Sequence, residues 1–272
     1  MPMRKRKPLK KWAIIILVVG GFLTLLGIWA LVALILKSNG NNVLPYPHET
    51  LAKAVEFLFG SDAPRTWVNM GWTLARLLIG YGCAFLFAAI FGTLAGLFPA
   101  FRKFMLSWLG LTKVIPTAAV VIILIGVFFG PQNRDWVTFI PSALTFIIAM
   151  PVLYEGFNKG IVEEDSDVVD ALELDCGSRN LKAVWLIHWP MIRPYIVLSI
   201  VTSLGMSMKV TVMSEVLSAS SSGRLGIGGM IMTANQTGGV EDVIAYSWIA
   251  VLMMLVIDIP WFILKLRKKN VK

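Results

Sequence analysis

The sequence predicts an all-α integral membrane protein with six transmembrane helices. Hydrophobic residues make up 57% of its 272 residues and charged residues only 15%, and the mean hydropathy is +0.73. These values exclude an ordinary soluble globule. The apolar runs are long and lack the strict alternation of barrel strands, so we expect helices. Residues 12–36, for example, form a run of 25 residues without a charge, enough to cross ~30 Å of hydrocarbon.

The first span, 12–37, is expected to remain as an anchor. Its apolar run is too long for the hydrophobic region of a signal peptide, and no A-x-A-like cleavage site follows it. An extracytoplasmic segment, 38–72, comes next, and the spacing of its apolar residues predicts a helix over 48–59 along the membrane surface. A core of five spans occupies 73–264. These spans are predicted at about 73–98, 114–130, 136–155, 191–214 and 243–264.

The distribution of Lys and Arg predicts the orientation of the chain. With the N-terminus inside, 17 of the 25 basic residues fall in cytoplasmic segments, five fall outside and three lie within spans. The cytoplasmic segments include basic tails at 1–11 and 265–272. The positive-inside rule therefore places both termini and the polar loop 158–189 in the cytoplasm. Topology and contact with anionic membrane lipid explain the net charge of +9, and nucleic acid is not expected as a partner.

Four residues in the predicted spans are candidates for a translocation pathway. Pro116 stands at the entrance of the third span, where a bent or broken helix can line a cavity. Arg76, Lys209 and Glu215 are charged at membrane depth, where such residues usually face the bundle interior or an aqueous path. For Lys209, snorkelling toward an interface is the alternative. Lys209 and Glu215 lie ~120° apart around a helix, so they are not expected to pair with each other.

Two glycine-rich stretches favour structural roles. Gly92 and Gly96 form a small-xxx-small pattern, for which packing within the chain is favoured over a dimer seam. The stretch 223–229 lacks the preceding strand and the Lys-Ser/Thr end of a phosphate-binding P-loop. We expect it to be a flexible outer turn between the fifth and sixth spans.

The sequence predicts no catalytic, metal or cofactor site. Cys83 lies in a span and Cys176 in the cytoplasmic loop, without metal-binding spacing. His48 and His188 are expected on opposite sides of the membrane. Because no nucleotide-binding motif and no nucleophile–base constellation occurs, the chain is not expected to be an enzyme.

The stretch 158–189 is a polar interruption in an otherwise membrane-like sequence. Seven of the 16 acidic residues of the chain lie between Glu163 and Asp175. Apolar residues recur at helical spacing before and after Gly177, and glycine suits the left-handed turn that ends a helix. We predict an elbow of two short amphipathic helices whose apolar faces would stay wet without a partner; a solvated loop is the alternative. The two faces are Val168, Ala171, Leu172 and Asp175, and then Leu181, Val184, Trp185 and His188.

This stretch resembles the EAA loop of ABC importer permeases. The pattern of that loop is Glu-Ala-Ala, three residues, Gly, nine residues, Ile, one residue and Leu-Pro. Gly177, Ile187 and Pro190 stand at the intervals of the family, with Trp189 in the place of Leu.

The acidic end of the elbow departs from that pattern. Counted back from Gly177, the Glu position holds Ala171, and the two Ala positions hold Leu172 and Glu173. Asp170-Ala171 fits if one residue is inserted before Gly177, or if the neighbouring cysteine takes the glycine place.

The resemblance extends over residues 44–264 and is greatest to the nitrate/sulfonate/taurine subfamily of these permeases. The segments that carry it are Leu44-Pro45-Tyr46-Pro47, Thr73-Leu74-Ala75-Arg76 with Gly80-Tyr81, Ile115-Pro116-Thr117-Ala118, Phe128-Phe129-Gly130, Glu215 at ten residues after Gly205, and Gly223 with Leu225-Gly226.

The resemblance implies a MetI-like permease fold that works as a homodimer or paired permease. It also implies two copies of a separate ABC ATPase bound at 163–189 and an extracytoplasmic substrate-binding protein. ATP-driven closure of the ATPase would move the elbow and switch access to the pathway. The coupling residues would be Asp170, Ala171, Leu172, Gly177, Ile187 and Pro190.

The substrate that the resemblance implies is a small anion or small organic solute, nitrate/sulfonate/taurine-like or thiamine-precursor-like. One alternative is a secondary transporter or channel without an ATPase partner. Another is an integral-membrane enzyme, although no cluster of catalytic residues at one membrane depth supports it.

Overall fold

Every regular element in the described part of the chain is a helix. The computed structural model describes residues 11–40, 43–128, 134–175, 177, 180–219, 224–237 and 239–269. Within these ranges the all-α prediction is confirmed. The helices are α1 (Lys11–Ser38), α2 (Pro47–Phe59), α3 (Ala63–Leu97), α4 (Pro99–Val114), α5 (Thr117–Phe128), α6 (Arg134–Val137), α7 (Ile140–Val162), α8 (Ser166–Asp175), α9 (Leu181–Ala183), the π-helical turn η1 (Val184–His188), α10 (Trp189–Met191), α11 (Arg193–Ser218), α12 (Ile227–Thr237) and α13 (Val240–Lys269).

In the described part of the chain, five helices are long and apolar enough to cross a membrane: α1, α3, α7, α11 and α13. The predicted third span over 114–130 is not among these helices, and the chain bends at Pro116, where a bent or broken helix was expected. There, α4 and α5 meet at a bend of 88°, and the 12 residues of α5 span only ~18 Å. The bend follows from Pro116, which forces Ile115 into an extended conformation (φ −73°, ψ 125°). A six-span count therefore requires this bent pair to cross as one broken span.

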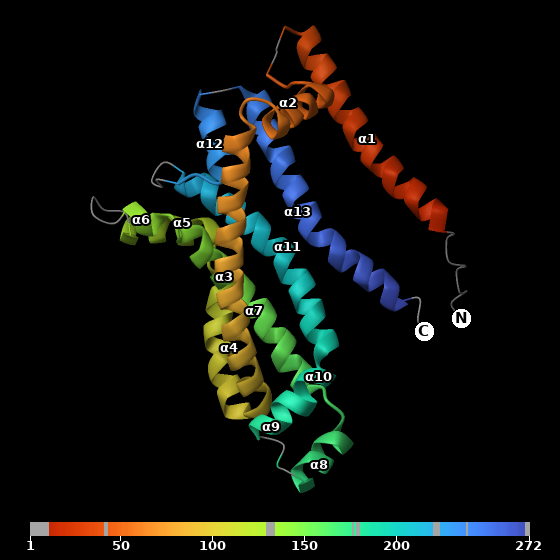
Figure 1. Ribbon diagram of the computed structural model, residues 1–272, viewed down its shortest axis with the longest axis vertical. Coiled ribbons are helices and arrows are strands. Elements are labelled where there is room, and N and C mark those ends of the chain that lie inside the picture. The colour runs from red at the N-terminus through yellow and green to blue at the C-terminus, as the bar shows by residue number, and fades with distance from the viewer. Residues whose placement is uncertain are drawn as a thin grey trace.

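The long axis of the molecule has two distinct ends (Figure 1). At one end, α2 and α12 pack beside the start of α13 and the end of α1. At the other end, α8 projects beyond the bundle. The Lys11 end of α1 and the Lys269 end of α13 both point toward the α8 side. Residues 1–10 and 270–272 of the two predicted basic tails lie outside the described residues.

The helix predicted at 48–59 is confirmed as α2, and α3 begins soon after it, at Ala63 rather than at 73. Thr50, Ala54 and Phe57 of α2 are buried, whereas Val55 is 55% exposed.

The link between α1 and α2 is electrostatic. Lys37 of α1 lies 3.1 Å from Glu49 of α2. The Tyr46 backbone N–H, followed by Lys37, lowers the pKa of Glu49.

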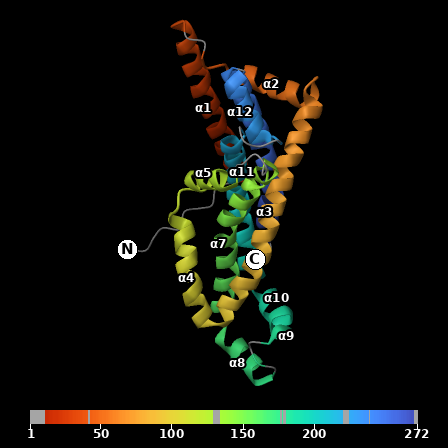
Figure 2. The same cartoon turned by 90° about the vertical axis from the view of Figure 1, so that its left-hand side faces the viewer.

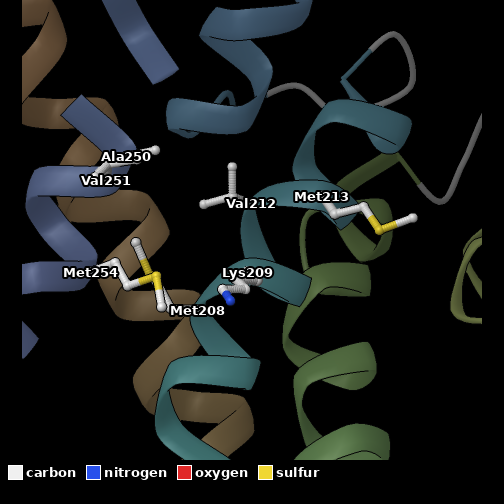
Figure 3. A pocket seen from close by; sticks show the side chains of 7 residues that line it. All are labelled: Met208, Lys209, Val212, Met213, Ala250, Val251 and Met254. Atoms are coloured by element: carbon white, nitrogen blue, oxygen red, sulfur yellow. The ribbon is translucent and has the colours of Figure 1, made fainter. Parts of the chain in front are cut away.

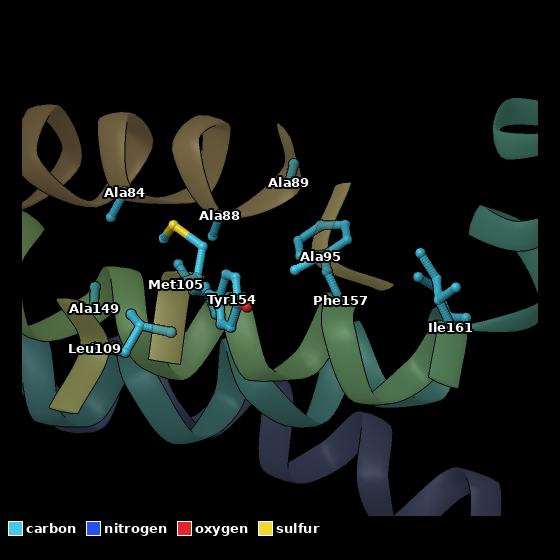
Figure 4. Close-up of a cluster of buried hydrophobic side chains, with 12 residues drawn as sticks. Ala84, Ala88, Ala89, Ala95, Met105, Leu109, Ala149, Tyr154, Phe157 and Ile161 are labelled. Carbon is cyan, nitrogen blue, oxygen red and sulfur yellow. The ribbon is translucent and has the colours of Figure 1, made fainter. Parts of the chain in front are cut away.

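The central packing joins α3 to α7 through small residues on α3. A Cβ added at Gly92 would lie 2.7 Å from Cβ of Phe157, and one at Gly96 would lie 2.7 Å from Cβ of Ile161. The prediction that this glycine pair serves packing within the chain is therefore confirmed, because any larger side chain would push α7 away. Figure 4 shows the buried residues that meet here: Ala84, Ala88 and Ala89 of α3, Met105 and Leu109 of α4, and Tyr154, Phe157 and Ile161 of α7.

Candidate functional site

The predicted elbow is present as two helical limbs on either side of Gly177. The first limb is α8; the second is the continuous turn from α9 through η1 to α10. Gly177 has φ +80°, the left-handed conformation that glycine adopts without steric cost. Its backbone N–H donates to the Leu172 carbonyl at 2.9 Å, which closes the end of α8. The glycine-turn prediction is therefore confirmed.

The first limb presents side chains to solvent at the extreme end of the molecule (Figure 1). Asp170 and Ala171 are exposed, and Leu174 is 90% exposed. Leu172, by contrast, is only 5% exposed. The free side of α8 therefore combines an uncovered leucine with exposed acidic residues.

The second limb is anchored to the bundle. Ile187 and Pro190 are half-buried. Trp189 donates its ring N–H to Thr93 Oγ1 of α3 at 3.1 Å, and its ring lies 5.7 Å from that of Phe157 on α7. A Cβ at Gly160 would lie 2.7 Å from Cβ of Ile192. This limb is therefore built into α3, α7 and α11.

A buried acid–histidine contact joins the two limbs of the elbow where they meet the bundle. His188 Nδ1 lies 2.5 Å from Glu164 Oε2, and the two side chains are only 2% and 3% exposed. Beside it, the Tyr195 hydroxyl donates to Glu163 Oε2 at 2.8 Å. These two contacts join the segment that follows α7 to η1 and α11.

Sequence reasoning missed this contact, because helical periodicity carries no information about partners in different helices. The only available signal was that His188 shares the apolar face of the second limb. The described residues contain no group of three or more His, Cys, Asp or Glu that could hold a metal ion.

Arg76 and Glu215, both predicted pathway residues, form a second buried polar centre. Arg76 Nη1 lies 2.7 Å from Glu215 Oε1, and their side chains are 4% and 1% exposed. Thr73 donates its hydroxyl to Glu215 Oε2 at 2.8 Å, and the Gly228 backbone N–H donates to the same oxygen at 3.1 Å. Arg76 Nη2 also donates to the Arg224 carbonyl at 2.5 Å. A buried ion pair needs such additional partners to offset its desolvation.

The described part of the glycine-rich stretch 223–229 is packed around this ion pair, so the prediction of a flexible outer turn is wrong for it. A Cβ at Gly226 would overlap the Glu215 carboxylate, and one at Gly228 would overlap the Val212 carbonyl. Glycine is needed here for close backbone approach. Gly223 itself lies outside the described residues, as do Phe129 and Gly130 of another resembling segment.

The structure places Lys209 and Pro116 away from this centre. Pro116 is exposed at the bend between α4 and α5. Lys209 is exposed and borders a hollow of about 340 Å³ between α11 and α13. Figure 3 shows Lys209 among the apolar side chains of this hollow, beside Met208 and Met254. The four predicted pathway residues therefore separate into one buried pair and two exposed positions.

The sequence model of a protein family described as "Binding-protein-dependent transport system inner membrane component" matches residues 85–266. This match covers more than half of the chain and includes both limbs of the elbow. A search of curated proteins finds no match.

Proposed function

Since the chain belongs to the family of binding-protein-dependent transport system inner membrane components, we propose that it is the permease subunit of an ATP-driven ABC importer. The family and the apolar helices establish a multi-pass membrane protein that serves transport. The proposal adds that two copies of a separate ATPase dock on the 163–189 elbow. ATP hydrolysis belongs to that partner.

The observation that carries the proposal is that one limb of the elbow is exposed while the other is anchored to the bundle. Its first limb is exposed and carries Asp170, Ala171 and Leu174, whereas its second limb is fixed to α3 and α7 through Trp189 and to the segment after α7 through His188. A force applied to α8 would therefore be passed through the Gly177 turn to α7 and α11. A merely solvated loop needs neither the uncovered leucine nor the buried attachment.

We assign the α8 end to the cytoplasm and the α12 end to the outer side. The excess of basic residues in the predicted inner segments supports this orientation. The ends of α1 and α13 point to the same side as α8 (Figure 1), in keeping with a cytoplasmic position of both termini. A substrate-binding protein would then deliver its cargo at the α2 and α12 end.

Lys209 supports a pathway along the exposed face of α11. It lies nine residues from Ser218 and sixteen from Arg193, about 14 Å and 24 Å from the two ends of the helix. This depth is beyond easy snorkelling, and an unpaired ammonium in hydrocarbon costs about 2.5–3.5 kcal/mol. We therefore place this face, with Pro116 at the neighbouring bend, on an aqueous path completed by a second copy of the chain. A small anion or small organic solute is the proposed cargo.

Reconstitution of the chain with its ATPase and binding protein in proteoliposomes tests this function. We expect ATP hydrolysis to rise when loaded binding protein is added, and uptake to require ATP. A secondary transporter or channel would instead support uptake driven by a solute or ion gradient in the absence of the ATPase. That outcome would overturn the proposal.

A further inference from the structure

An aromatic groove runs along the side of the bundle between α3, α4 and α7. It has a volume of about 480 Å³, and apart from Thr112 all its lining side chains are apolar. Its floor is a set of ring contacts: Phe87 packs on Phe146 at 5.3 Å and Phe91 on Phe101 at 6.0 Å. Figure 2 shows α4, which forms one wall, standing beside α7 in the half of the bundle nearer α8.

The groove has the length of one membrane leaflet. Its lining on α4 extends from Phe101 to Thr112, a distance of ~16 Å along the helix axis, and half of the hydrocarbon core measures ~15 Å. It ends at the bend before α5, so it does not continue into the other leaflet.

The groove suits an extended acyl chain, because its lining is apolar along its length and the side chains on its rim are exposed. Phe104 and Trp108 on its rim are 60% and 62% exposed, so its contents would lie against them.

Positive charge stands at the end of the groove nearer α8. Arg102 and Lys103 occupy the first turns of α4 beside Phe101 and Phe104, and the first turn of this helix contains no acidic residue. Arg102 is half-buried and Lys103 is exposed. Neither forms an ion pair with another residue in the described part of the chain. A cationic end next to an apolar groove complements a lipid with a negative headgroup.

We infer that the groove between α3, α4 and α7 is a binding site for an anionic glycerophospholipid of the leaflet on the α8 side. One acyl chain lies along Phe104 and Trp108, and Arg102 and Lys103 hold the headgroup phosphate. Each basic residue near a membrane surface contributes about a fivefold preference for an anionic lipid, so the pair gives a preference of about 25-fold.

Native mass spectrometry of the full chain, purified from vesicles of equal phosphatidylglycerol and phosphatidylcholine with identical acyl chains, tests the inference. We expect bound phosphatidylglycerol to exceed phosphatidylcholine about 25-fold. In the double variant Arg102→Gln/Lys103→Gln the ratio should fall to about one. The matched control Lys159→Gln removes an exposed lysine on the same side that is paired with Glu155, and it should keep the preference.

A second pair of variants tests the groove itself. Trp108→Ala should reduce binding of both lipids, whereas Leu106→Ala should not, because Leu106 is equally exposed at 61% but lies outside the groove lining. An equal ratio of the two lipids in the unaltered protein would overturn the inference. A second test uses Phe104→Cys in a background where Cys83 and Cys176 are replaced by Ser. A disulfide between two copies through this cysteine would also overturn the inference, since a second copy would then occupy the groove.

Discussion

Removal of the Glu164 carboxylate should release the second limb of the elbow from the bundle. Glu164→Leu keeps an apolar side chain in the site but leaves Nδ1 of His188, a side chain only 2% exposed, without its acceptor. A buried polar group that loses its partner costs about 1–3 kcal/mol. A local loss of 3 kcal/mol corresponds to about a hundredfold rise in the population of the detached limb.

Hydrogen–deuterium exchange over 181–191 measures this release directly. In Glu164→Leu we expect its backbone amides to exchange about a hundredfold faster than in the unaltered protein, while amides in the middle of α3 keep their rates. Asp167→Leu is the matched control, because Asp167 is an exposed acid on α8 and its loss should change these rates less than fivefold. Equal exchange in Glu164→Leu and Asp167→Leu would refute the view that the buried contact anchors the limb.

Three further changes test the packing and the pathway. Glu215→Leu should lower the unfolding free energy by about 3–5 kcal/mol, because it leaves the Arg76 charge buried without its partner. The double variant Arg76→Met/Glu215→Leu should recover much of this loss. If the effects of the two single changes on thermal unfolding simply add in the double variant, the pairing is contradicted. Gly92→Val should destabilise the α3–α7 contact by about 1–3 kcal/mol or more, whereas Gly82→Val, where a Cβ meets nothing within 4 Å, should leave the unfolding temperature nearly unchanged. Lys209→Cys in the assembled complex should react with a charged, membrane-impermeant thiol reagent, while Leu255→Cys on an exposed apolar face should not; equal labelling would remove Lys209 from the pathway.

The helical class and most of the spans were predictable because the hydrophobic effect acts on long continuous runs. The run 12–36 predicts α1 in this way. Gly177 was predictable for a different reason: only a few residues tolerate the left-handed turn, so a glycine between two amphipathic stretches marks a helix end.

The buried polar centres were not predictable, because their members come from distant segments. Arg76 and Glu215 were recognised singly as costly charges in spans, but they lie on different helices, α3 and α11, and no periodicity links them. Glu164 and His188 are likewise brought together only when the elbow folds back on the bundle.

The bend at the predicted third span has a local cause. The run 114–130 is apolar throughout much of its length, so hydropathy alone predicts a crossing helix. Pro116 instead ends α4 at Val114 and redirects the chain through 88°. The helix α4 before this bend is not among the predicted spans, which leave 99–113 between the second and the third.

The central claim is that the Gly177 elbow holds the ATPase, and co-purification of the two subunits with Gly177→Pro tests it most directly. Proline fixes φ near −65°, which is incompatible with the φ of +80° at this position, and it removes the N–H that donates to Leu172. We predict that the variant inserts into the membrane at normal levels but no longer retains the ATPase, while Gly82→Ala retains it fully. An intact complex with Gly177→Pro would contradict the account.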